Sequence, residues 1–359
     1  MTDAAGNHDI VSGRPRPPAL HDVGQRAGVS HQTVSRVLNG HPNVRPETRD
    51  RVLAAIRDLG YRRNTAARAL VTRKSAVIGV ITSGSPHFGP SSTFQSVELA
   101  ARDAGYFVSV ASVRTQDRPS LAAMLDHFMS QAVEGIVVIA PQDFAAEAVA
   151  EAAGHVPTVV VADAPHLTGV VHVSFDQFAG AEMAMTHLID RGHRSIAHIG
   201  GPADWFDAVA RLEAWRSCLD LAGLPRGKLL QGDWTAASGY RAATSLLGSG
   251  LPDAIFVAND LMALGVLRAF REHGVSVPND VSVVGFDDVD GSAYFDPPLT
   301  TVRQEFEALG ALAVRSLRDW LSSGSPDAIG SQRIRPSLVV RESTSAGRDR
   351  SDAHRPPAA

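Results

Sequence analysis

The spacing of apolar residues predicts three short helices before residue 60. The stretches ALHDVGQRAG, VSHQTVSRVLNG and RPETRDRVLAAIRDLGY each repeat apolar positions every three or four residues, the period of one face of an α-helix. The first two end at glycine, and the third has Pro46 in its first turn, where proline is tolerated. The apolar face of the third stretch consists of Val52, Ala55, Ile56 and Leu59.

From residue 76 the pattern changes to short apolar runs separated by longer amphipathic stretches. The runs are AVIGVI, YFVSVA, GIVVIA, TVVVA, SIAHIG, AIFVA and VSVVGF. Strands that are apolar on both faces and alternate with helices predict parallel sheets covered by helices on each side. Because about 270 residues exceed what one such sheet needs, we expect two lobes.

The two ends of the chain have a different composition. Residues 1–18 are rich in Gly, Pro and Arg, and residues 346–359 are polar, so we expect a disordered arm and a disordered tail. The start has no apolar stretch typical of a secretory signal, and no run approaches the 18 apolar residues of a membrane span. These observations predict a cytoplasmic protein without a membrane partner.

The net charge of −4 averages two parts of opposite sign. Residues 1–74 contain 13 basic and 6 acidic residues, a net charge of +7, whereas the remainder carries −11. A cationic module on an acidic body indicates a nucleic-acid or anionic-membrane partner for the module. The single cysteine, Cys218, excludes a disulfide framework and a cysteine-based zinc site.

The first two predicted helices form a helix-turn-helix pattern, with Ala27-Gly28-Val29 as the turn and Ser30 as the cap of the second helix. The exposed face of that helix is polar and free of acids. His31, Gln32 and Arg36 are the predicted base readers, because Gln pairs with adenine and Arg with guanine in the major groove. Four further residues suit phosphate contacts, which position the helix: Ser30, Thr33, Ser35 and Asn39.

This segment resembles the N-terminal region of lac repressor/galactose repressor family regulators. The likeness runs through DVGQRAGVSHQTVSRVLNG to LGYRRN and ARAL. Two departures concern stability: Ala19 replaces the family's capping Thr, which costs about 0.5–2 kcal/mol, and Gly24 replaces a helical Ala, which costs about 1 kcal/mol.

The resemblance also gives residues 64–74 a role as a hinge helix that enters the minor groove. Leu70 occupies the position of the family's inserted leucine, and Ala67 lies where two hinge helices approach each other. An apolar wedge of this kind kinks DNA, and a helix of about eight residues is not stable alone. The alternative is an ordinary linker helix whose Leu70 packs on the core.

Polar residues follow several predicted strands, where open parallel sheets place ligand sites. Asp163, Asn259 and Asp287 follow such strands, and this placement favours a ligand role for Asn259 and Asp287. Arg211 and Trp234 lie in helical patterns. Carboxylates, amides, Arg and Trp together suit a sugar's paired hydroxyls and apolar face. Four neighbouring residues have simpler readings, as a helix cap, a turn residue and two core aromatics: Asp260, Asp288, Trp205 and Trp215.

The resemblance extends to about Glu342 through GDWTAASGY, VANDLMALG and SVVGFDDVDGSAYFDPPLTTVRQEF, which are similar to the lac repressor branch. It implies an all-α helix-turn-helix headpiece (19–63) and an α/β, two-lobed, periplasmic-binding-protein-like core (75–345) that the chain crosses three times. The implied lobes are about 75–174 plus 303–332, and 175–302 plus 333–345.

The same resemblance implies an effector site in the core, formed by Ser83, Asp163, Arg211, Trp234, Asn259, Asp287, Gln304 and Phe306. His87, Pro90 and Thr93 would line the first lobe's side of the cleft. Two departures, Ile139-Ala140 and Asp207, mean that the far end of a sugar is met differently than in the lac branch.

These features together predict a homodimeric repressor that binds a palindromic DNA operator and is released by a small saccharide or glycoside. Two alternatives remain, a regulator that uses its ligand as corepressor and a solute-binding protein of a sugar transporter. The sequence holds no P-loop, G-x-S-x-G, H-E-x-x-H or dinucleotide fingerprint. We therefore expect no enzyme activity, no cofactor and no metal site.

Overall fold

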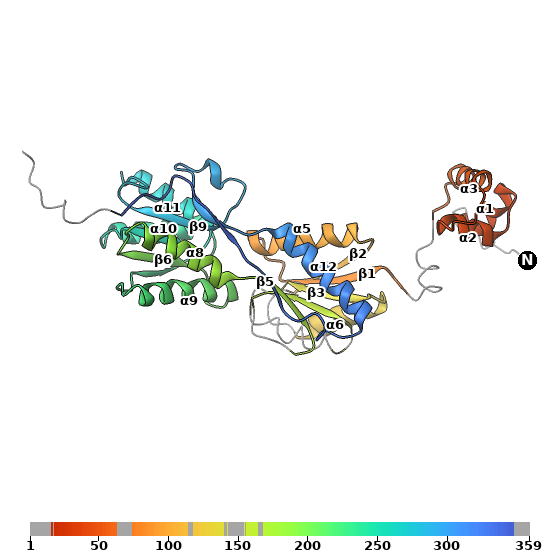
Figure 1. Ribbon diagram of the computed structural model, residues 1–359, viewed down its shortest axis with the longest axis horizontal. Coiled ribbons are helices and arrows are strands. Elements are labelled where there is room, and N and C mark those ends of the chain that lie inside the picture. The colour runs from red at the N-terminus through yellow and green to blue at the C-terminus, as the bar shows by residue number, and fades with distance from the viewer. Residues whose placement is uncertain are drawn as a thin grey trace, which may run out of the picture. The chain divides into compact units, whose positions relative to one another are not determined.

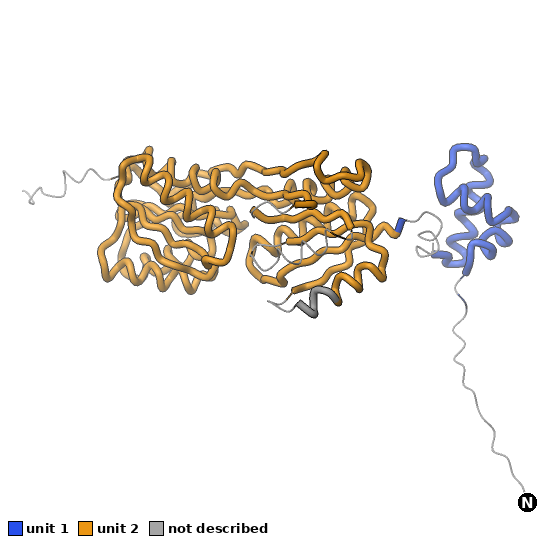
Figure 2. Tube along the Cα trace, turned by 90° about the horizontal axis from the view of Figure 1, so that it is seen from below, with its two compact units in different colours: residues 1–74 blue, residues 75–359 orange. Residues whose placement is uncertain are grey.

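A computed structural model describes residue 16 and residues 18–62, 74–113, 118–139, 142, 154, 156–163 and 168–347. The chain divides into two compact units, residues 1–74 and 75–359 (Figure 2). The predicted minor-groove residues Ala67 and Leu70 lie outside the described residues, as do most of the predicted arm, hinge and tail.

The described residues of the first unit form three helices, α1 (Leu20–Ala27), α2 (His31–Leu38) and α3 (Pro46–Leu59). Gly28 ends α1 in the left-handed conformation, at φ 65°, which glycine adopts without steric cost. Ala19 provides no side-chain cap, but the Asp22 carboxylate accepts a hydrogen bond from the Ala19 N–H at 2.7 Å. The predicted apolar faces meet in one small core: Val23, Ala27, Val34, Val37, Val52, Ala55 and Tyr61.

The second unit contains two six-stranded sheets, each covered by helices on both faces (Figure 1). The first sheet has the order β11-β5-β4-β3-β1-β2, and its strands run parallel. Helices α5 (Phe88–Asp103) and α12 (Phe306–Ser323) pack on one face and α6 (Arg118–Ser130) on the other. The strands are β1 Val77–Thr82, β2 Phe107–Ser112, β3 Gly135–Ile139, β4 Thr158–Val161, β5 Val171–Phe175 and β11 Gln332–Ile334.

The second sheet has the order β12-β10-β9-β8-β6-β7, with only β12 antiparallel to its neighbour among the described pairings. Its strands are β6 Ile196–Gly200, β7 Leu229–Gln231, β8 Ala254–Val257, β9 Ser282–Asp287, β10 Thr300–Arg303 and β12 Ser337–Val339. Helices α8 and α9 cover one face, and α10 and α11 cover the other. These helices are α8 Gln177–Asp190, α9 Phe206–Leu221, α10 Ala236–Leu247 and α11 Asp260–Glu272, with a 3-10 turn at Ser292–Tyr294.

The chain passes between the two lobes three times, after β5, after β10 and after β11. Each crossing lies one or two residues later than predicted. Phe175 and Arg333 pair within the first sheet, and Arg303 pairs within the second, because the strands continue pairing to those residues. Both lobes are therefore built from segments that are distant in the sequence.

Candidate functional site

Helix α2 of the first unit presents the predicted DNA-reading residues on its outer side. Its cap is Ser30, whose hydroxyl accepts a hydrogen bond from the Thr33 backbone N–H at 3.2 Å. Val34 and Val37 are buried on the opposite side, which fixes the rotation of the helix. Four polar residues are exposed and two are half-buried: His31, Gln32, Arg36 and Asn39, then Thr33 and Ser35.

In the second unit a cavity lies between the two lobes, with about 680 Å³ of empty space including its open mouth. Residues from both lobes line it. Seven of the eight predicted effector residues are among them: Asp163, Arg211, Trp234, Asn259, Asp287, Gln304 and Phe306. His87, Pro90 and Thr93 line the first lobe's side. Ser83 is not part of the lining, and its hydroxyl accepts a hydrogen bond from the Ser85 backbone N–H at 3.4 Å.

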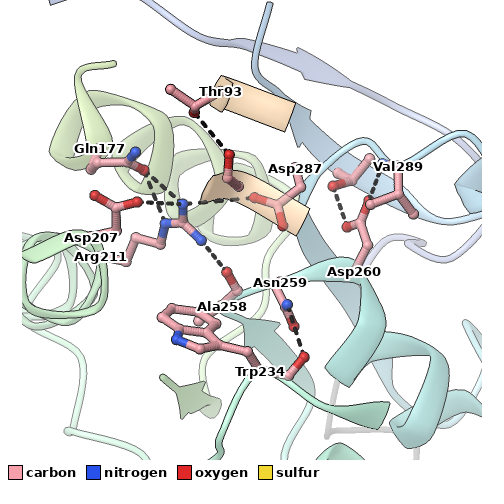
Figure 3. A network of polar contacts seen from close by, with 12 residues as sticks. Thr93, Gln177, Asp207, Arg211, Trp234, Ala258, Asn259, Asp260, Asp287 and Val289 are labelled. Atoms are coloured by element: carbon pink, nitrogen blue, oxygen red, sulfur yellow. Dashed lines mark hydrogen bonds and ion pairs between the residues drawn. The ribbon is translucent and has the colours of Figure 1, made fainter. Parts of the chain in front are cut away.

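Arg211, on α9, lies at the centre of a polar network in this cavity (Figure 3). Its Nε and Nη2 donate to Gln177 Oε1 at 3.1 and 2.8 Å, and its Nη1 donates to the Ala258 carbonyl. The guanidinium carbon lies 3.7 Å from the centre of the Phe286 ring, a stacking arrangement that arginine favours. Arg211 is only 3 % exposed, and each of its three nitrogen atoms donates to a protein acceptor.

Three carboxylates surround this network. The Asp287 and Asp207 oxygens lie 3.7 and 3.9 Å from Arg211 Nη2. Burial raises the pKa of Asp207, of Asp163 and, most strongly, of Asp287, and the positive charge of Arg211 opposes each of these shifts. Arg333 opposes the shift in the pKa of Asp163 further. Asp207 and Asp287 share the single guanidinium of Arg211. The cavity therefore has many hydrogen-bond acceptors and little positive charge left to bind an anionic ligand.

Aromatic rings form another wall of the cavity. Trp234 precedes Thr235, the cap of α10, and has a positive φ of 69°. This conformation costs a residue with a side chain on the order of 1–3 kcal/mol. The Trp234 and Trp205 rings pack edge to face, with their centres 5.5 Å apart. The Trp205 ring packs in the same way against the His87 ring of the other lobe, with 5.6 Å between centres. The buried indole Nε1 of Trp234 has no hydrogen-bond partner. Trp205 lies in the hydrophobic core, as expected, and also lines the cavity. Trp215 is a core residue stacked on His198.

The helix cap expected at Asp260 is instead Asn259. The Asn259 side chain accepts from the Met262 N–H at 2.9 Å and donates to the Trp234 carbonyl at 3.2 Å. Asp260 is the first residue of α11 and is fully buried. It accepts hydrogen bonds from Ser292 Oγ, Thr301 Oγ1 and the Val289 N–H, and Val289 lies beside it in Figure 3. Asp260 thus holds the loop that follows Asp287.

Gln177 was missed by the sequence analysis, although it joins the two halves of the site. It follows β5 and the α8 cap Asp176 directly. The strand-end rule would have found it if VHVSF had been recognised as a strand. His87, at the start of α5, was expected in the cleft, but its contact with Trp205 was not.

The described residues contain no helix long and apolar enough to cross a membrane. In the same part of the chain no three His, Cys, Asp or Glu side chains are grouped in a way that could hold a metal ion.

Comparisons with known proteins match both units. Residues 19–64 match the family model for bacterial regulatory proteins of the lacI family, and residues 185–344 match the periplasmic binding protein-like domain. The lactose operon repressor of Escherichia coli (strain K12) is 36 % identical over 333 residues, which cover 92 % of each chain. The HTH-type transcriptional regulator CelR of Thermobifida fusca is 34 % identical, over 92 % of this chain and 99 % of its own.

Solved structures give the same result. The lac repressor dimer bound to operator and the anti-inducer ONPF is similar with a TM-score of 0.82 at 36 % identity, over 92 % of this chain and 100 % of that one. The CelR–cellobiose complex is similar with a TM-score of 0.67 at 32 % identity, over 91 % of this chain and 99 % of that one. The family model at the head and the identity along the whole core lead to one conclusion: the chain belongs to the lacI family of bacterial regulatory proteins.

Proposed function

We propose that this protein is a transcriptional repressor that binds a two-fold symmetric operator as a homodimer and releases it when a neutral saccharide enters the cavity between the lobes. Membership of a family of transcription regulators supports the DNA-binding role over an enzyme. Related solved structures include a repressor dimer on its operator and a regulator bound to cellobiose.

The head supports specific DNA reading. His31, Gln32 and Arg36 are exposed near the start of α2, where side chains reach base edges in the major groove. Four residues around them would contact phosphates, namely Ser30, Thr33, Ser35 and Asn39. The hinge residues Ala67 and Leu70 would enter the minor groove when two hinge helices pair on DNA.

The main support for the effector role is a cavity rich in hydrogen-bond acceptors, in which the donors of Arg211 are already bonded to protein groups. Asp207 and Asp287 share one guanidinium, which already donates to Gln177 and Ala258. Such a cavity favours ligands that donate hydrogen bonds, such as saccharide hydroxyls, and disfavours phosphates and carboxylates, whose charge would meet the aspartates. Trp234 offers an apolar surface for a sugar ring. The proposed contacts are the seven predicted residues of the lining together with Asp207.

Release follows if the saccharide favours an arrangement of the lobes that disfavours paired hinge helices. Coupling of this kind is typically about 1–3 kcal/mol, and it is reciprocal, so operator should weaken saccharide binding by the same factor. A saccharide that instead tightens operator binding would identify the effector as a corepressor.

The test is a fluorescence anisotropy titration of the full chain on the palindromic site upstream of its own gene, with a panel of neutral saccharides and sugar phosphates. We expect operator binding and release by a neutral saccharide. Arg211→Ala should keep operator affinity and lose release, because its removal leaves Asp207 and Asp287 without their shared cation. Arg216→Ala, on the exposed side of the same helix, is the matched control.

Two outcomes would contradict the proposal, and a third would correct the site. Failure to bind any such DNA would refute the repressor, and saccharide binding without DNA binding would favour a solute-binding protein. Normal release of Arg211→Ala would remove this arginine from the effector site.

A further inference from the structure

Arg333 lies beside the cavity between the lobes and was not among the predicted site residues. It is the middle residue of β11, the edge strand of the first sheet. Its Nη2 lies 3.0 Å from Asp163 Oδ1. The Arg333 side chain is 54 % exposed, whereas the Asp163 side chain is only 8 % exposed. A half-exposed arginine therefore holds a buried carboxylate that lines the cavity.

Three elements meet at this ion pair. Asp163 follows β4, Arg333 lies on β11, and β5 runs between these two strands. The Gln177 backbone N–H, just after β5, also hydrogen-bonds to Asp163. The Gln177 side chain in turn accepts two hydrogen bonds from Arg211. Contacts therefore run without interruption from Arg333 to the centre of the site.

We propose that Arg333 is a positioning residue that holds the Asp163 carboxylate in place as a hydrogen-bond acceptor for the saccharide. This inference rests on the proposed function of the cavity. Arg333 would act without touching the ligand, because it is absent from the cavity lining and reaches Asp163 from the solvent side of the sheet edge.

The charges around Asp163 explain why the carboxylate depends on this partner. Burial raises the pKa of Asp163, and the nearby charge of Asp176 raises it slightly further. Arg333 lowers it most, followed by the Gln177 N–H and then by Arg211. Without Arg333 the pKa of Asp163 moves further up. The carboxylate then takes up a proton at a higher pH and loses its strength as an acceptor.

The first test is a double-mutant cycle on the ligand-free full chain, with Arg333→Met, Asp163→Asn and both together. All four tryptophans lie in the second unit, so urea unfolding followed by tryptophan fluorescence reports on the core. We expect the two changes to be non-additive, as for residues in direct contact. Strict additivity would overturn the proposal, whether or not any saccharide binds.

The second test is calorimetry with a saccharide that releases the operator, at pH 7.5 and pH 5.5. Arg333→Met should weaken binding about fivefold at pH 7.5, the upper range for a partly exposed ion pair, and more at pH 5.5. Arg333→Lys should restore most of the affinity. Arg335→Met, an exposed arginine two residues further on, should behave as wild type. Taking the ratio of variant to wild-type affinity removes the effect of other groups that titrate in the same range, such as Asp260, whose pKa burial raises to about 6.

The outcomes separate the two proposals. An equal loss of affinity at both pH values, or no rescue by lysine, would refute a role through the Asp163 charge. If no saccharide binds wild type, the proposed function fails and the effector role of Arg333 fails with it, while the cycle still measures the ion pair.

Discussion

Replacing Asp260 with asparagine is expected to stabilise the core at pH 7.5 and to change how its stability depends on pH. The pKa of Asp260 is raised by burial to about 6 from 3.8, although hydrogen bonds from Ser292, Thr301 and Val289 lower it. An acid whose pKa is higher in the folded state penalises folding above that pKa. The shift of about two units corresponds to about 3 kcal/mol at pH 7.5.

Asparagine removes this penalty and keeps an acceptor. Its carbonyl oxygen can replace the Asp260 oxygen that accepts from Val289 and Ser292, while the amide faces Thr301. The Thr301 hydroxyl must then turn around, which costs about 1 kcal/mol. We expect a net gain of about 2 kcal/mol at pH 7.5. Asp260→Ala leaves three buried donors without an acceptor, which costs more than the ionised carboxylate did. We expect a net loss of about 1–2 kcal/mol at pH 7.5.

The assay is urea unfolding followed by tryptophan fluorescence between pH 4 and pH 7.5. As the pH falls through 6 toward 4, the folded carboxyl takes up its proton before the unfolded one, so wild type loses the penalty. The advantage of Asp260→Asn should therefore shrink over this window, and the deficit of Asp260→Ala should grow. Parallel pH profiles for wild type and Asp260→Asn would refute the raised pKa and the reasoning built on it.

Three further predictions concern function and packing. Arg36→Ala should cost about 1–3 kcal/mol at one base pair of the operator, measured by anisotropy on operator variants; an equal loss on all of them would assign Arg36 to a phosphate. Asn259→Ala should lower the free energy of unfolding by about 1 kcal/mol through loss of the α11 cap, and an unchanged urea midpoint would contradict this. An alanine Cβ at Gly201 would lie 2.2 Å from the Trp234 ring and would displace it. Gly201→Ala should therefore weaken saccharide binding at least about tenfold and leave operator affinity unchanged. Normal saccharide affinity in calorimetry would show that the position of the ring does not matter.

The fold was predictable where strands are continuously apolar. All seven predicted runs form strands. Six of them are largely buried on both faces of a sheet, whereas β2 is an edge strand whose residues are exposed or half-buried. The strands that were missed are short or carry polar residues, as in VHVSF, TTVR and QRI. Their pairing depends on neighbours that are distant in the sequence, such as β5 for β11, and no local pattern contains that information. The crossings of the chain were misplaced by one or two residues for the same reason.

Cavity residues were predictable where strand ends and family motifs coincide, as at Asn259 and Asp287. The pairing of those residues was not predictable. Nothing near Arg211 indicates that Gln177 and Ala258 occupy most of its donors, and nothing near Arg333 indicates its contact with Asp163. The same limit applies to the cap of α11, where Asn259 and Asp260 are both suitable residue types. The extended backbone of Asn259 and its hydrogen bond from the Met262 N–H make it the cap.

The discontinuous first lobe has a consequence for synthesis of the chain on the ribosome. Its core includes Leu309, Leu312 and Trp320 of α12, and its edge strand is β11. The sheet from Val77 to Phe175 is thus translated about 130 residues before α12 covers one of its faces, a delay on the order of ten seconds. During that time the second lobe emerges almost completely, while the face of the first sheet that α5 and α12 cover together has only α5. Nascent chains should therefore depend on chaperones until α12 has left the ribosome.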